Sequence, residues 1–114
     1  MSMVLKARRL DDVVILDLSG RITMGEGALV LRNNIQKMLA DGDRKFLLNL
    51  SDVNYIDSSG LGELVTSFTT VRNQGGELKL LNLTRRVQDL LQITKLLTVF
   101  EAFNSEAEAL KTLK

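Results

Sequence analysis

Residues 57–62, Asp-Ser-Ser-Gly-Leu-Gly, bring together a carboxylate, two hydroxyls and two glycines. Serine hydroxyls serve as nucleophiles, as helix caps or as acceptors of phosphate, and glycines let another backbone come close. The segment follows the apolar stretch FLLNLSDVNYI and precedes the helix-like stretch ELVTSFTTVRN. We therefore interpret it as a strand-to-helix turn.

A nucleophilic serine needs a base close to its hydroxyl, and the composition offers none. The chain contains no His and no Cys, and no Lys lies close in sequence to Ser58 or Ser59. The same absence excludes thiolate and imidazole metal sites, disulfides and a His-based catalytic triad. We expect a protein that is not an enzyme, with no catalytic residue, no metal ion and no cofactor.

Two further interpretations of the turn concern nucleotide binding and helix capping. A nucleotide-binding loop is disfavoured, because Val65 stands where a third glycine is needed after Gly60 and Gly62, and no Walker-type GxxxxGK motif occurs. Simple capping remains an alternative, since Asp or Ser before a helix commonly has no other role. One cap is sufficient, however. Three capping side chains followed by poor helix formers favour a serine that receives phosphate from another protein.

Length and charge limit the class of protein. The 114 residues suffice for one domain with a real core, and 15 Lys and Arg against 14 Asp and Glu leave a net charge of +1. That balance disfavours nucleic acid as a ligand. The first residues, MSMVLKARRLDD, lack the apolar stretch of a signal peptide, and no run of about 18 apolar residues occurs. We expect a soluble cytoplasmic protein that does not insert into a membrane.

Strand-like segments alternate with helix-like segments along the chain. The opening pair of strands, separated by an acidic turn at 10–12, predicts an antiparallel hairpin. A continuous apolar run at 45–50 is typical of a strand that is covered on both faces. The strand-like segments lie at 3–9, 13–20, 45–50 and 77–83, with a weaker extended stretch at 97–103.

Four helices are predicted from apolar spacing and capping residues. The first spans 28–39, the second starts at 61 and stops at the glycines 75–76, a third is capped by Thr84 and runs to Leu91, and Ser105 opens a last one. The inward-facing positions are Leu61, Leu64, Val65, Phe68 and Val71 in the second helix and Ala109, Leu110 and Leu113 in the last. Alternating strands and helices predict an open α/β sheet with right-handed crossovers. Ser58 then lies at the carboxyl edge of the sheet, beside the partial positive charge of a helix N-terminus.

The segment FLLNLSDVNYIDSSGLGEL, with GGELKLLNL downstream and VVILDLSGRIT upstream, resembles the STAS domain of bacterial anti-sigma factor antagonists over nearly the whole chain. The resemblance implies a single domain over 1–114, with a mixed sheet of four to five strands flanked by about four helices. It also implies that Ser58, directly after the Asp of the motif, is the phosphorylated residue. The residues implied to contact the partner are Asp57, Ser59, Gly60, Leu61, Gly62 and Thr23.

The same resemblance implies a cycle of partner switching. In this family the unphosphorylated protein binds an anti-sigma factor, which is itself a serine kinase, and thereby frees a sigma factor for transcription. Phosphorylation of the serine, here Ser58, breaks the complex, and a separate serine phosphatase resets it. We expect a regulated binding module.

One segment departs from the family pattern. Between the second strand and the first helix the family commonly carries an Asp and a Thr-Ala pair, whereas residues 21–28 read RITMGEGA and have Thr23 where the acid is expected. We interpret this segment either as a change in partner choice or as a flexible loop.

Two alternatives to the sigma pathway remain. STAS domains also occur as docking subunits of membrane transport assemblies, in which no phosphate need be transferred. DNA binding through TRRVQDLLQITKLL is disfavoured, because its only adjacent cations are Arg85 and Arg86. Its apolar residues favour a core-facing stripe made of Val87, Leu90, Leu91 and Ile93.

Overall fold

The computed structural model describes residues 3–113. These residues form a five-stranded sheet in the order β1-β2-β3-β4-β5, in which β1 is antiparallel to β2 and the other neighbouring strands are parallel. The predicted α/β class, with a mixed sheet that opens in a hairpin, is confirmed. The elements in this range are β1 (Met3–Leu10), β2 (Val13–Ile22), α1 (Glu26–Ala40), β3 (Lys45–Ile56), α2 (Ser58–Asn73), β4 (Glu77–Leu81), α3 (Arg85–Ile93), β5 (Ala102–Phe103) and α4 (Glu106–Thr112).

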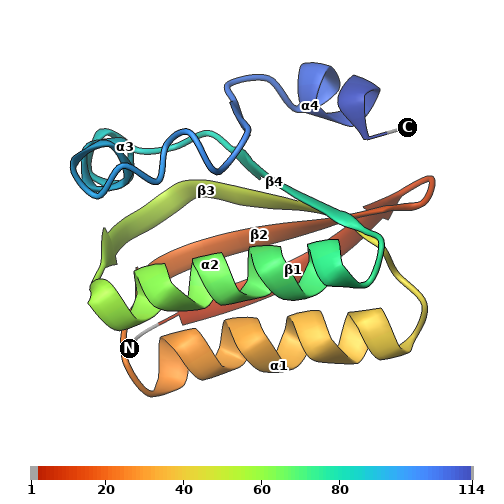
Figure 1. Cartoon of the computed structure of the whole chain (residues 1–114), viewed down its shortest axis with the longest axis horizontal. Helices are drawn as coiled ribbons and strands as arrows, with labels where there is room; N and C mark the ends of the chain where they lie inside the picture. The colour runs from red at the N-terminus through yellow and green to blue at the C-terminus, as the bar shows by residue number, and fades with distance from the viewer. Residues whose placement is uncertain (1–2, 114) are drawn as a thin grey trace.

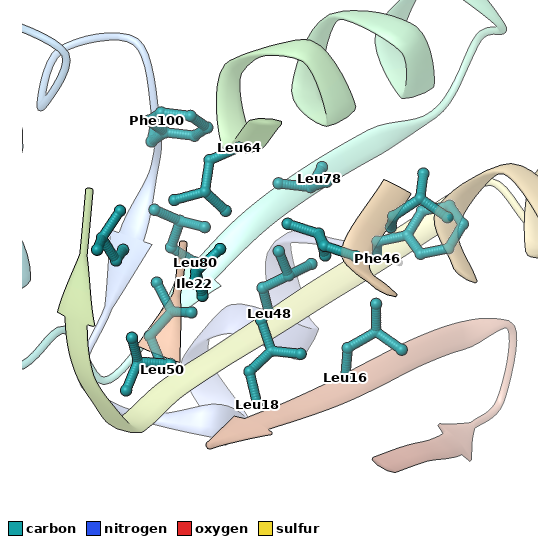
Figure 2. Packing of buried hydrophobic residues seen from close by; sticks show 14 of the residues in the cluster. Leu16, Leu18, Ile22, Phe46, Leu48, Leu50, Leu64, Leu78, Leu80 and Phe100 are labelled. Atoms are coloured by element: carbon teal, nitrogen blue, oxygen red, sulfur yellow. The ribbon is translucent and has the colours of Figure 1, made fainter. Parts of the chain in front are cut away.

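The sheet is covered on both faces. Helices α1 and α2 lie side by side on one face and α4 lies on the other (Figure 1). Figure 2 shows Leu16, Leu48 and Leu80 of three strands within the cluster that Leu64 of α2 joins. The opposite cluster contains Val13, Ile15, Leu47, Leu81, Ala109 and Leu113. Because successive strand side chains point to opposite faces, the continuous apolar runs of β2 and β3 serve both clusters.

Strand β3 is six residues longer than the predicted 45–50, because it ends at Ile56. Only its first part, Lys45–Asn49, pairs with β4, and the extension pairs with β2 alone through two register shifts. These irregularities allow Leu50 and Val53 to enter the same core although they are three positions apart. Polar residues between and after them hid the extension from an interpretation based on apolar runs.

The apolar stripe of α2 is only partly as predicted. Leu61, Leu64 and Val71 are buried, whereas Val65 and Phe68 are half-buried. Glu63 and Ser67 are buried in addition. The reason is that α2 packs against α1 as well as against the sheet, so its buried face is wider than the predicted stripe and rotated toward α1.

The region after β4 follows the prediction in its capping residues. Thr84 caps α3 and accepts a hydrogen bond from Val87 N at 3.3 Å, and Ser105 caps α4 in the same way. Helix α3 continues to Ile93, two residues beyond the predicted end. Ala109 of α4 and Leu113 at its C-cap are buried and Leu110 is half-buried, in agreement with their predicted inward orientation.

The extended stretch predicted at 97–103 is wrong over most of its length, because only Ala102–Phe103 form a strand. Residues 97–99 form a turn, in which Val99 N donates to Leu96 O at 2.9 Å. Leu97 of this turn and the following Phe100 still join the main core, whereas Val99 is exposed. No helix within residues 3–113 has both the length and the apolar character that a membrane span requires.

Candidate functional site

The turn at 57–62 lies where β2 and β3 end together. Ile22 and Ile56 are paired as the last residues of these parallel strands, and Asp57 N donates to Ile22 O at 3.3 Å. Asp57 is the N-cap of α2, because its side chain accepts a hydrogen bond from Gly60 N at 2.7 Å. The predicted strand-to-helix turn is therefore confirmed, and it lies at the carboxyl edge of the sheet.

Asp57 also holds the loop that precedes α1. Its Oδ2 atom accepts a hydrogen bond from Met24 N at 3.0 Å, across 33 positions of sequence. The N–H groups of Met24 and then of Gly60 hold the pKa of the Asp57 carboxyl below its ordinary value, because both stabilise the charged form. The Asp57 carboxylate thus connects the loop that precedes α1 to the first turn of α2. No local sequence signal pointed to the contact with Met24.

Ser58 and Ser59 are the first two residues of α2, and both are exposed. Within the described residues neither hydroxyl forms a hydrogen bond, since the capping bond is supplied by Asp57. Their position in the first turn places them beside backbone N–H groups that lack helical acceptors. Helix capping therefore explains the presence of Asp57 but not that of the two serines, whose hydroxyls are free to interact with another molecule.

The two glycines of the turn have different surroundings. A Cβ atom on Gly60 would lie 1.9 Å from Ile22 O, so this residue lets α2 start directly against the end of β2. A Cβ atom on Gly62 would have nothing within 4 Å. Gly62 is exposed on the outer face of α2, where a glycine gives the helix no internal advantage.

A groove of about 460 Å³ runs between the first turns of α1 and α2, next to the serines. Met24 and Leu29 line it with exposed fractions of 75% and 47%, and Ser59 and Gly62 line it from the other helix. Thr23 is half-buried at the start of the loop, where its carbonyl accepts a hydrogen bond from Ala28 N at 3.0 Å. Leu61, like Gly60, is buried and supports this surface from beneath.

A buried polar cluster joins the same two helices. Glu63 is 4% exposed, accepts a hydrogen bond from Arg32 Nε at 2.9 Å and another from Ser67 Oγ at 3.2 Å. The sequence interpretation missed this cluster. An acidic residue in the first half of a helix is ordinarily at the surface, and the only available signal was the spacing of four between Glu63 and Ser67.

Comparison with known proteins identifies the fold. The STAS domain family model matches residues 5–109. This chain belongs to the STAS domain family. The anti-sigma-B factor antagonist of Bacillus subtilis (strain 168) is 42% identical over 74 residues, which are 65% of this chain and 67% of that protein. A Thermotoga neapolitana protein, the TM1081 homolog, is 33% identical over 104 residues, which are 91% of this chain and 92% of the relative.

Solved STAS domain structures share the whole architecture. The crystal structure of tm1081 from Thermotoga maritima has a TM-score of 0.88 and 29% identity, covering 96% of this chain and 93% of that one. The unphosphorylated form of the anti-sigma factor antagonist SpoIIAA has a TM-score of 0.81 at 20% identity, with 96% and 95% covered, which shows a common fold. In this STAS domain the exposed serines therefore stand on a scaffold that the family shares.

Proposed function

We propose that this protein is an anti-sigma factor antagonist whose binding to an anti-sigma factor is switched off by phosphorylation of Ser58. The observation that carries the proposal is the exposed Ser58 hydroxyl at the first residue of α2, left without a capping role by Asp57. The name of the Bacillus subtilis relative, anti-sigma-B factor antagonist, supports the choice of partner. The implied kinase is the anti-sigma factor itself, and a serine phosphatase reverses the modification.

The partner surface in this proposal is the edge formed by the serines and the groove beside them. Ser58, Ser59 and Gly62 provide its polar and open part, and the exposed apolar side chains of Met24 and Leu29 provide a part that loses contact with water on binding. Asp57, Gly60, Leu61 and Thr23 act by positioning, since they fix the turn and the loop 21–28. Thr23 carries no charge, so this loop offers the partner no carboxylate at that position.

In this proposal the phosphate weakens binding by placing charge on the contact surface, without changing the fold. It adds about −1.5 to −2 charges at Ser58. The helix N-terminus favours negative charge by roughly 0.3–1 kcal/mol, whereas the neighbouring Asp57 carboxylate opposes it. These local contributions are small and opposite in sign. Docking, in contrast, removes water from a dianion that finds no matching cation, and the effective penalty is several kcal/mol. The complex should therefore weaken by orders of magnitude, because each 1.4 kcal/mol corresponds to a factor of ten.

The test begins with capture of the anti-sigma factor on immobilised Ser58→Ala protein from the native cell. Incubation of the wild-type protein with that factor and ATP, followed by mass spectrometry, should place phosphate on Ser58. Calorimetric titration should show tight binding by Ser58→Ala and by the matched control Ser59→Ala, and little binding by Ser58→Asp. Phosphate on Ser59 with continued labelling of Ser58→Ala contradicts the assignment. Equal affinities of Ser58→Asp and Ser58→Ala exclude a charge switch and favour the docking subunit of a transport assembly.

A further inference from the structure

A second groove lies between the end of β3 and helix α3. Its volume is about 520 Å³, and it is lined by Tyr55, Ile56, Arg85, Arg86, Asp89, Leu90 and Ile93. None of these residues belongs to the 57–62 turn or to the groove between α1 and α2. The floor is apolar and the rim is charged.

The exposed position of Ile93 corrects the predicted core-facing stripe of α3. Val87 and Leu91 are buried and Leu90 is half-buried, but Ile93 is 78% exposed. The physical reason is helical geometry: two residues beyond Leu91 correspond to a rotation of about 200° around the axis, so Ile93 points away from the core. A large aliphatic side chain with this exposure adjoins the aromatic ring of Tyr55 in one groove.

Two arginines from different elements make cation–π contacts with the ring of Tyr55. The guanidinium carbon of Arg21, on β2, lies 4.7 Å from the ring centroid, and that of Arg86, on α3, lies 6.0 Å from it. Within residues 3–113 neither guanidinium has a carboxylate partner. Arg85 is 94% exposed at its side chain and makes only a long contact of 3.9 Å with Asp89. Arg85 and Arg86 therefore line the groove together with one carboxylate, Asp89, and Arg21 adds a third cation against the ring of Tyr55.

The contacts with Tyr55 restrict the two guanidinium groups without using their N–H donors for a hydrogen bond. Such groups are suited to carboxylates, which they bind through paired, charge-assisted hydrogen bonds. The apolar part of the groove can accommodate a bulky aliphatic or aromatic side chain of the same ligand, located between its carboxylates. A symmetric contact with a second copy is disfavoured, because it would bring the same cationic patch onto itself. Nucleic acid is disfavoured too, since Asp89 lines the patch and three cations contribute little phosphate affinity at physiological salt.

We propose that this groove binds an acidic amphipathic segment of a partner protein. A bulky apolar residue of that segment enters between Tyr55 and Ile93, and flanking carboxylates pair with Arg21 and Arg86. Because no lining residue of this groove belongs to the 57–62 turn, it is a second interaction surface beyond the proposed switch.

The chain supplies its own probe for this site. Tyr55 is its only tyrosine and it contains no tryptophan, so tyrosine emission reports on the groove alone. The ligand for the test is a synthetic helical peptide with leucines at positions i, i+3, i+4 and i+7 and glutamates on either side of them. Its control is the same peptide with every Glu replaced by Gln. The Glu peptide should change Tyr55 emission saturably, and the Gln peptide should bind about tenfold more weakly.

Variants separate the charged and apolar contributions. The Arg21→Gln/Arg86→Gln double variant should lose about tenfold in affinity for the Glu peptide and most of the salt dependence. Ile93→Ser should also weaken binding, whereas Leu29→Ser on α1 and Lys6→Gln on β1 should not. Melting curves of all variants check that the fold is retained. Because Ser58→Asp should bind the peptide like the wild type, failure of the proposed switch and failure of this site are distinguishable.

Several outcomes overturn the proposal. One is the absence of a saturable change with the Glu peptide, and another is equal affinity for the Glu and Gln peptides. Stronger binding to phosphatidylglycerol vesicles or to duplex DNA would assign the patch to a different class of ligand. Dimerisation in sedimentation experiments that Ile93→Ser abolishes would assign the groove to a second copy of this chain.

Discussion

At the scale of single residues, the same amino acid serves two purposes within one turn. Gly60 is required by the chain itself, because Ile22 O occupies the space that a side chain would need. A side chain at Gly62, in contrast, would contact no other part of the chain. The glycine is retained there although it costs a helix about 0.5–1 kcal/mol relative to alanine. This difference indicates that the fold requires a glycine at position 60. It also supports the assignment of Gly62 to the proposed contact with a partner.

Alanine substitution at the two glycines should therefore have opposite effects on stability. Gly60→Ala should destabilise the protein by about 1–3 kcal/mol, since the added Cβ forces the end of β2 away from α2. Gly62→Ala should stabilise it by about 0.5–1 kcal/mol through helix propensity. Urea unfolding of both variants measures these changes.

The second glycine also gives a test of the partner surface. If a partner backbone approaches α2 at Gly62, the more stable Gly62→Ala variant should bind the captured anti-sigma factor more weakly than the wild type. Unchanged affinity would show that Gly62 lies outside the interface, and a loss of stability in this variant would contradict its placement on the open face of the helix.

At the scale of elements, the packing of α1 against α2 decides the shape of the site. The contact includes the buried Glu63, which is paired with Arg32 and Ser67. Asp57 adds a second connection, because it binds both the first turn of α2 and the loop before α1. The groove beside Ser59 keeps its form because both helix entries are fixed to each other.

Removal of the Arg32 side chain should lower the free energy of unfolding, because the buried Glu63 carboxylate loses its cationic partner. Arg32→Ala leaves Glu63 with only Ser67 as a partner, and we expect a loss of about 1–3 kcal/mol in the free energy of unfolding. The upper part of that range is disfavoured, because the Arg32 side chain is 48% exposed and water screens the pair. The Arg32→Ala/Glu63→Gln double variant should recover part of the loss in urea unfolding. A double variant no more stable than Arg32→Ala would show that the charge of Glu63 is not the cause.

A second prediction at this scale concerns the aromatic contact between α2 and the turn before β5. Phe68 meets Phe100 edge to face, with ring centroids 5.2 Å apart, but it is only half-buried. Its position within the apolar stripe alone predicts a loss of about 3–5 kcal/mol for Phe68→Ala, as for a fully buried Phe. Partial exposure lowers the expected loss to about 2–3 kcal/mol. Phe46→Ala, at a fully buried position, is the matched control and should cost the larger amount. Equal losses in thermal or urea unfolding would contradict this ranking.

At the scale of the whole molecule, the proposed switch acts on a surface that lies outside the hydrophobic core. Ser58 lies outside both hydrophobic clusters and its side chain is exposed. A charge at this position therefore has little access to the core. Partner binding and fold stability should respond independently to a change at this residue.

Ser58→Asp and the phosphorylated protein should consequently melt within about 3 °C of the wild type, because the opposing local contributions are each below about 1 kcal/mol. Calorimetric melting of the three forms measures this, with Gly60→Ala as a control whose transition should be clearly lowered. A large drop in melting temperature on phosphorylation would mean that the modification reshapes the domain and does more than block a surface.

Much of this architecture was predictable from local sequence. The hairpin, the caps Thr84 and Ser105 and the strand-to-helix turn at 57–62 depend on residues within a few positions of each other. Apolar spacing, capping side chains and glycines act over that range, so their pattern determines where helices and strands begin. The start of the second helix was predicted at 61, but α2 begins at Ser58, because the Asp57 cap lets the turn residues enter the helix.

Only the tertiary structure decided which side chains meet across the fold. The bond from Met24 to Asp57 spans 33 positions, and the pair of Arg32 and Glu63 spans 31. The end of β3 and the exposure of Ile93 likewise depend on which neighbour covers each surface. A single chain carries no local signal for such contacts, because burial is set by the packing of whole elements against one another. The contacts of Arg21 and Arg86 with the ring of Tyr55 likewise exist only in the folded protein.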